Sequence, residues 1–305
     1  MELRHLRYFL AIAKERSFTA AAERLGVAQP ALSQQIRALE GELGVTLIER
    51  GARTKGLTDA GISFAVRARR ILLESEGAVE EMAAFAGARL GRVRFGSALQ
   101  SLMQARGAAL LAEFRRLHPG FRVAFREAHT RPLLELLARG RLDLALVHLG
   151  KGGGPPALKI DFERVPVEIE RLYEEPLVLA VGPRHRLAGR SEVRWRDLAQ
   201  EEFVSFGVGS TIRELAARAA RQAHLEIRSP VSAANLGTIR AFVSAGLGVA
   251  VLPQVALTLP GPPLRGLRLT APELTRVVAL ARNTIRYQSP AASAFTDFLR
   301  ARLRP

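Results

Sequence analysis

The stretch LRHLRYFLAIAKERSFTAAAERLGVAQPALSQQIRALEGELGVTLIER, residues 3–50, decides the fold of the N-terminal part of the chain. Its apolar residues first recur at helical spacing, which predicts a helix over residues 3–15. A second, short helix follows, and either Ser17 or Thr19 can cap its start. It ends at Gly26, because the left-handed conformation that closes a helix is easily reached only by glycine.

A third helix is predicted to begin at Gln29-Pro30, since proline loses no intrahelical hydrogen bond in the first turn. One apolar stripe runs along it, at Leu32, Ile36, Leu39 and Leu43. The opposite face is polar and carries Gln29, Ser33, Gln34 and Arg37. Two short helices joined by a glycine turn, the second with an exposed polar face, are typical of a helix-turn-helix. Glutamine can bond adenine in the major groove, and arginine can reach guanine or phosphate.

The segment VTLIERGARTKGLTDAG, residues 45–61, alternates between apolar runs and a basic tip. It predicts a wing of two strands, whose tip would meet phosphates or an adjacent minor groove. The candidate DNA contacts are therefore Thr19, Gln29, Pro30, Ser33, Gln34, Arg37, Arg50, Arg53 and Lys55. The alternative is a small helical bundle whose polar face meets only water.

Residues 59–89 contain no proline and predict one long helix. We expect its apolar residues to share a stripe and to pair with the same helix of a second copy. The candidate dimerisation residues are Ile62, Val66, Leu72, Leu73, Val79 and Met82. In the alternative arrangement this helix packs on the C-terminal part of its own chain.

The remaining two thirds alternate between short apolar strands and amphipathic helices. A β-α-β-α-β pattern from about residue 91 to 150 predicts a parallel sheet with helical crossovers. The pattern restarts after the glycine- and proline-rich segment 152–156, and Thr211 with Glu214 forms a predicted capping box. Two such α/β units suit a sensor that binds its ligand at the carboxyl ends of its strands.

Residues 1–61 resemble the winged helix-turn-helix of the LysR-type transcriptional regulators, through residues 3–50 and the motif LTDAG at 57–61. The segments GRVRFG, EAHT, GRLDLALV, EEPLVL and AGLGVAVLP resemble the effector domain of the same family. The resemblance implies an α/β chain with three parts: a winged helix-turn-helix at 1–58, a linker helix at 59–89, and a periplasmic-binding-protein-like effector domain at 90–305. It further implies a first lobe at 92–164 and 268–305, a second lobe at 165–267, and dimers that often form tetramers.

Three positions depart from the pattern of that family. Ala28 stands where serine is common, so a helix cap worth about 1 kcal/mol is absent. Gln34 replaces a frequent arginine, and Gly56 replaces a frequent basic residue of the wing. Both changes bear on DNA contacts.

Hydroxyl and amide side chains follow several strands of the expected effector domain. The candidate effector-binding residues are Ser97, Gln100, Ser101, Thr130, Ser205, Phe206 and Asn235. Polar groups near helix N-termini suit a carboxylate, so we expect a small organic acid as the effector. Each of these residues could equally be a helix cap or a loop hydrogen-bonder.

Composition excludes several other functions. The chain has no cysteine, which rules out disulfides and thiolate chemistry. Its six histidines show no metal-ligand spacing, and no Walker loop, dinucleotide fingerprint or nucleophile elbow is present. We therefore expect no catalytic residue, no metal and no cofactor. The net charge of +16 favours DNA, although residues 1–58 hold only nine basic against six acidic residues.

Without a signal peptide or a run of about 18 apolar residues, we expect a cytoplasmic protein that contacts no membrane. The hypothesis is a homo-oligomeric regulator of transcription that binds double-stranded DNA at an interrupted palindrome and responds to a small molecule. RNA polymerase is a further candidate partner. The alternatives are an architectural DNA-binding protein that takes no effector, and a cytoplasmic solute-binding α/β protein.

Overall fold

The computed structural model describes residues 1–49, 56–85, 91–150, 167–283 and 287–303. They form two compact units, one built mainly from the N-terminal helices and one from the C-terminal α/β region. In the described part of the chain, no helix is both long and apolar enough to cross a membrane.

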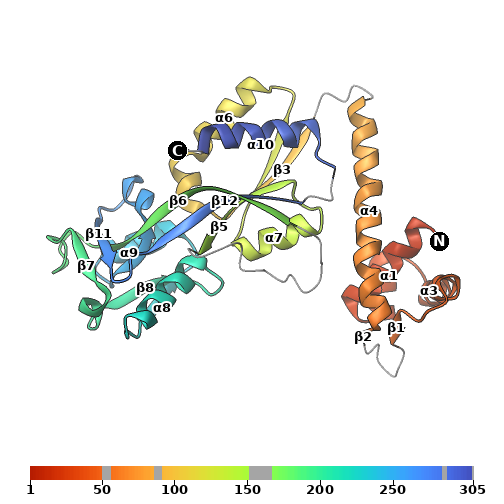
Figure 1. The fold of residues 1–305 in the computed structure, drawn as a ribbon, viewed down its shortest axis with the longest axis horizontal. Helices are drawn as coiled ribbons and strands as arrows, with labels where there is room; N and C mark the ends of the chain where they lie inside the picture. The colour runs from red at the N-terminus through yellow and green to blue at the C-terminus, as the bar shows by residue number, and fades with distance from the viewer. Residues whose placement is uncertain (50–55, 86–90, 151–166, 284–286, 304–305) are drawn as a thin grey trace. The chain divides into compact units, whose positions relative to one another are not determined.

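The N-terminal unit is a three-helix core with a two-stranded wing and a long helix (Figure 1). The helices are α1 (Leu3–Glu15), α2 (Phe18–Leu25), α3 (Gln29–Leu43) and α4 (Asp59–Phe85). The wing strands β1 (Ile48–Glu49) and β2 (Gly56–Leu57) pair antiparallel. The first three helices lie where their apolar periodicity predicts them.

The core of this unit is filled by the apolar stripes of the helices. Leu32, Ile36 and Leu39 of α3 are fully buried, together with Phe9 of α1. Phe64 of α4 packs edge-on against Phe9, with ring centroids 5.2 Å apart. The start of α4 is thus part of the same core as the helix-turn-helix.

The C-terminal unit begins with three parallel strands. Strands β3 (Arg92–Ser97), β4 (Arg122–Glu127) and β5 (Leu144–Gly150) are parallel, as the β-α-β-α-β pattern predicts, and they pair in the order β4-β3-β5. The first crossover is continuous from α5 (Gln100–Leu102) through the π-helical segment η1 (Met103–Gly107) to α6 (Ala108–Leu117). The second crossover is α7 (Thr130–Ala138).

A long strand, β6 (Val167–Val181), then runs through both halves of the unit. Its first part pairs with β12 (Thr275–Asn283), and its second part pairs with β10 (Ala250–Pro253) and β11 (Arg265–Thr270). We call residues 91–150, 167–175, 275–283 and 289–303 the first lobe, and residues 177–274 the second lobe. The sheet is mixed, because β12 is antiparallel to both β5 and β6.

The second lobe has its own hydrophobic core, which includes the fully buried Trp195. Its other elements are β7 (Glu192–Arg194), η2 (Trp195–Leu198), β8 (Glu202–Phe206), α8 (Thr211–Gln222), β9 (Arg228–Ala233), α9 (Leu236–Ser244) and η3 (Gln254–Thr258). The chain was expected to return to the first lobe at residue 268. It does so with β12, because Leu269 and Leu274 still pack in the core of the second lobe.

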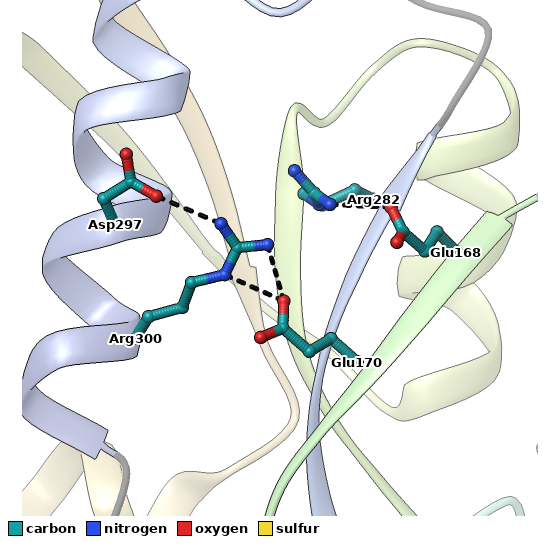
Figure 2. A network of polar contacts seen from close by, with 5 residues as sticks. All are labelled: Glu168, Glu170, Arg282, Asp297 and Arg300. Carbon is teal, nitrogen blue, oxygen red and sulfur yellow. Dashed lines mark hydrogen bonds and ion pairs between the residues drawn. The ribbon is translucent and has the colours of Figure 1, made fainter.

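The last helix, α10 (Pro290–Leu303), covers the first lobe on the same side of the sheet as α6, with α7 on the other side (Figure 1). Figure 2 shows how polar contacts hold it. Arg300 donates to Glu170 of β6 at 2.6 and 2.8 Å and to Asp297 at 3.0 Å. Arg282 of β12 donates to Glu168 at 2.6 Å, which joins the two strands. This network fixes the first half of β6.

Candidate functional site

The turn between α2 and α3 places α3 on the surface. Ser17 caps α2 by accepting a hydrogen bond from the Ala20 amide at 3.2 Å, which settles the choice between Ser17 and Thr19. Gly26 has a φ of +68° and ends α2 with a left-handed turn. Ala28 precedes α3 and offers no side-chain cap, as its methyl group dictates.

The exposed face of α3 carries the polar side chains that the sequence assigned to DNA. Gln29, Pro30, Gln34 and Arg37 are exposed, and Ser33 is half-buried. Thr19, on α2, is exposed as well. The other predicted DNA contacts, Arg50, Arg53 and Lys55, lie outside the described residues.

A buried histidine, which the sequence did not single out, joins α1 to α3. The Glu2 amide donates to His5 Nδ1 at 3.2 Å, so the ring proton resides on Nε2. His5 Nε2 lies 2.8 Å from Gln35 Oε1 and donates to it. Gln35 lies on the inner side of α3, so this contact fixes the start of α1 against the helix that presents the polar face.

The base of the wing is fixed to α3 by a single carboxylate. Glu40 Oε1 accepts hydrogen bonds from the amides of Leu47 at 2.8 Å and Ile48 at 3.2 Å. Thr58 Oγ1, just after β2, donates to the carbonyl of Thr46, just before β1, at 2.7 Å. Two side chains therefore set where the wing leaves the helical core.

The predicted dimerisation residues of α4 do not share one environment. Ile62, Val79 and Met82 are exposed, and Val66 and Leu72 are half-buried. Leu73 is only 6% exposed and lies inside the protomer. Ile71, which the sequence analysis left out, is exposed and falls on the same face as Val79 and Met82 at 100° per residue. The apolar residues of α4 therefore do not form the single exposed stripe that the sequence predicted. Ile71, Val79 and Met82 are exposed apolar residues on one face of the later part of this helix.

A cavity of about 420 Å³ lies between the two lobes of the C-terminal unit. Four helices, α5, α7, α8 and α9, begin at its wall, since the first residue or the N-cap of each is in the lining. The lining residues are Ala98, Gln100, Ser101, Gln104, Glu127, Ala128, His129, His148, Phe206, Ser210, Ile212, Ala234, Asn235, Leu236, Gly237, Pro253 and Arg276. Amide N–H groups in the first turn of a helix have no intrahelical acceptor and attract negative charge. The capping box expected at Thr211 does not form, because Ser210 is the N-cap of α8 and makes no side-chain cap bond.

Four of the seven predicted effector residues line this cavity: Gln100, Ser101, Phe206 and Asn235. Ser97 and Thr130 are buried outside its lining, and their hydroxyls bond the Leu99 amide and His148 respectively. Ser205 lines a second cavity of about 110 Å³, which shares Phe206 with the first. The start of α5 in the first lobe and the start of α9 in the second lobe therefore both face the larger cavity.

An arginine that the sequence analysis did not select is the main charge on the cavity wall. Arg276 is 2% exposed, donates to Glu175 Oε2 at 2.6 Å from Nε, and donates to Ser101 Oγ at 3.3 Å from Nη2. Its Nη1 makes no hydrogen bond to a described residue. Desolvation lowers the pKa of Arg276 from its ordinary value, and Glu175 opposes that shift, so the guanidinium remains charged.

A second overlooked group is His148 of β5, which lines the cavity and is buried. Burial, with the positive charge of Arg276 as the next cause, lowers the pKa of His148 to about 3. His148 is therefore neutral near pH 7. Its Nδ1 lies 3.3 Å from Thr130 Oγ1.

Both omissions had a signal in the sequence. Arg276 stands in the apolar segment TRVVALAR, and His148 stands in LDLALVHLG. A charged or titratable residue inside a strand that is otherwise buried needs a partner or a function. Both residues lie within strands, whereas the sequence predicts effector residues at strand ends and in loops.

Within the described residues, no group of three His, Asp or Glu side chains could hold a metal ion. Comparison with family models matches residues 3–62 to the family described as "Bacterial regulatory helix-turn-helix protein, lysR family". Residues 86–304 match the family described as "LysR substrate binding domain". The N-terminal helices therefore belong to a DNA-binding domain of this family. The alternative of a solute-binding protein, in which these helices would have no function of their own, is not favoured.

Two curated relatives and one solved structure illustrate the similarity. The chain is 33% identical over 309 residues to the HTH-type transcriptional regulator YnfL of Escherichia coli K12, covering 100% of this chain and 99% of that protein. It is 34% identical to a hydrogen peroxide-inducible genes activator of Dickeya chrysanthemi, covering 84% and 80% respectively. A cysteine-to-aspartate variant of full-length OxyR from Pseudomonas aeruginosa superposes with a TM-score of 0.65 at 25% identity, over 98% of this chain and 95% of that one.

Proposed function

Because the chain belongs to the LysR family of DNA-binding transcriptional regulators, which are not enzymes and carry an effector-binding domain, we propose that the cavity between its lobes binds a small organic acid. The observation that carries this proposal is Arg276, a buried guanidinium on the cavity wall whose Nη1 has no acceptor among the described residues. A carboxylate is the acceptor that such a group pairs with best.

The other wall groups limit the charge of the ligand. Glu127 lines the cavity, and Glu175 already neutralises part of the Arg276 charge. A ligand with two carboxylates would therefore meet like charge, whereas a monocarboxylate needs only Nη1 and the N-terminal amides of α8 or α9. His148, being neutral, adds a hydrogen-bonding group without adding charge.

This chain cannot sense peroxide through a thiol. It contains no cysteine, so no thiol is available for oxidation by peroxide. We therefore assign its effector to ligands that bind reversibly.

In the same proposal, DNA is read by α3 through Gln29, Ser33, Gln34 and Arg37. Thr19 and Pro30 flank this face, and Arg50, Arg53 and Lys55 extend it through the wing. Contacts along exposed Ile71, Val79 and Met82 of α4 pair two copies, which places two reading helices on successive half-sites. The division into residues 1–58, 59–89 and 90–305, action in the cytoplasm and contact with RNA polymerase belong to the same proposal.

The effector assignment is tested by measuring the melting temperature of the full-length protein with a panel of monocarboxylic acids, their amides and dicarboxylic acids. We expect a monocarboxylate to raise the melting temperature while its amide does not. Ser101→Ala and Arg276→Gln should remove that rise. Arg282→Gln is the matched control, since Arg282 lies on the same strand and outside the cavity lining.

If an acid raised the melting temperature of Arg276→Gln as much as that of the parent, the effector site would not be this cavity wall. If the amides acted as well as the acids, the ligand class would be wrong. Binding of genomic DNA fragments by the same preparations separates these results from loss of the fold.

A further inference from the structure

One side chain crosses the cavity and joins the two lobes. Gln100 is the first residue of α5 in the first lobe, and its Oε1 accepts a hydrogen bond from the Leu236 amide at 3.0 Å. Leu236 is the first residue of α9 in the second lobe, and it is 1% exposed.

The start of α9 needs this external acceptor. The first N–H groups of a helix have no intrahelical partner. Asn235, the N-cap of α9, accepts from the Thr238 amide at 2.8 Å and therefore serves only the third position. The Leu236 amide, at the first position, is satisfied by Gln100, which reaches it from the opposite lobe.

Within the described residues, the chain passes from one lobe to the other where β6 and β12 cross between them, at Pro176 and Thr275. Two neighbouring connections of this kind permit hinge motion of the lobes about the crossing. Contacts across the cavity then decide how far the lobes separate. Gln100 and Leu236 stand on opposite walls of that cavity.

We propose that Gln100 is a latch, a positioning residue that holds the two lobes together in the effector-free protein. Its amide oxygen accepts the hydrogen bond of one N-terminal amide of α9, that of Leu236. An effector that enters the cavity therefore meets two lobes whose separation this contact already sets. The inference rests on the proposed function of the cavity, since it concerns how that site is regulated. A serine or threonine at position 100 would be too short to make the same contact.

The chain lacks cysteine, so a pair of labelling sites can be introduced without background. Ser293→Cys on α10 reports on the first lobe, and Ala241→Cys on α9 reports on the second, both at exposed positions. Spin labels on this pair give the distribution of interlobe distances in the full-length protein. Labelled chains are diluted into an excess of unlabelled chains, so that distances between subunits do not contribute.

In this background Gln100→Ala removes the acceptor, and Gln100→Glu keeps an acceptor at the same reach. Gln104→Ala is the control, because it removes an amide that lines the same cavity but makes no hydrogen bond across it to a described residue. We expect Gln100→Ala to increase the ratio of open to closed lobes about fivefold, equivalent to about 1 kcal/mol. Gln100→Glu and Gln104→Ala should keep the distribution of the parent. All four proteins should melt within a few degrees of one another.

A distribution for Gln100→Ala identical to that of the parent would overturn the latch. The proposal would also be overturned if Gln104→Ala broadened the distribution of interlobe distances as much as Gln100→Ala does. That result would show that any loss of side-chain volume opens the lobes. The measurement is made without an effector, so it stands even if the cavity binds no organic acid. Failure of the effector assignment and failure of the latch therefore give different results.

Discussion

Arg276 and Glu175 occupy directly paired positions on β12 and β6, and Arg276 Nε lies 2.6 Å from Glu175 Oε2. Both residues are buried. The pair lies next to Pro176, where β6 passes from one lobe to the other. The same contact therefore fixes the guanidinium on the cavity wall and joins the strands that carry both lobes.

Removing one partner of this pair should destabilise the fold strongly, because it leaves an uncompensated buried charge. We expect Arg276→Met to lower the free energy of unfolding by about 3–5 kcal/mol. The double variant Arg276→Met/Glu175→Leu should lose considerably less, since neither charge remains. Urea denaturation of the parent, both single variants and the double variant measures the coupling. Additive losses would show that the two side chains do not interact.

His148 should make stability depend on pH in acid. Its pKa is lowered from 6.5 to about 3 in the folded protein, so between these values the unfolded chain binds a proton that the folded chain does not. The stability that depends on a neutral His148 is fully present above pH 6.5. As the pH falls from 6.5 toward 3, the free energy of unfolding decreases by up to about 1.4 kcal/mol per pH unit.

The test is the slope of unfolding free energy between pH 6 and 4 in the parent and in His148→Asn. The variant should show a slope smaller by about one proton. His224→Asn is the control, because His224 is exposed and asparagine tolerates its positive φ of 55°. Equal slopes for the parent and His148→Asn would contradict a neutral buried imidazole.

The missing cap of α3 can be restored. In Ala28→Ser the new hydroxyl can accept from the Ala31 amide, since Pro30 at the second position has no N–H. We expect a gain of about 1 kcal/mol in unfolding free energy. Ser17→Ala, which removes the existing cap of α2, should cost a similar amount. A neutral or destabilising effect of Ala28→Ser would mean that α3 starts in another geometry.

Local patterns predicted the N-terminal unit well. Gly26, Pro30 and the stripe of Leu32, Ile36 and Leu39 specify helices through spacing and backbone chemistry that no distant residue overrides. The same local reasoning was wrong at Thr211. There the helix begins after Ser210, and no reciprocal cap bond forms.

Long-range features were less accessible. Residues 167–174 mix polar and apolar side chains without a regular strand period, and their pairing with β12, about a hundred residues away, makes them a strand. Arg276 was missed because its partners, Glu175 and Ser101, come together only in the folded sheet. Thr130 follows its strand as predicted, whereas Ser97 is the last residue of β3. The hydroxyls of both residues bond protein groups rather than line the cavity.

The central claim is that α3 reads base pairs through its exposed polar face. Its most direct test compares the affinity of the parent, Gln29→Ala and Arg37→Ala for an operator selected from genomic DNA and for random duplex, at one fixed salt concentration. We predict that each substitution reduces the preference for the operator by about 1–3 kcal/mol while binding to random duplex changes little. An equal loss on both duplexes would contradict the claim, because it would make these residues phosphate contacts.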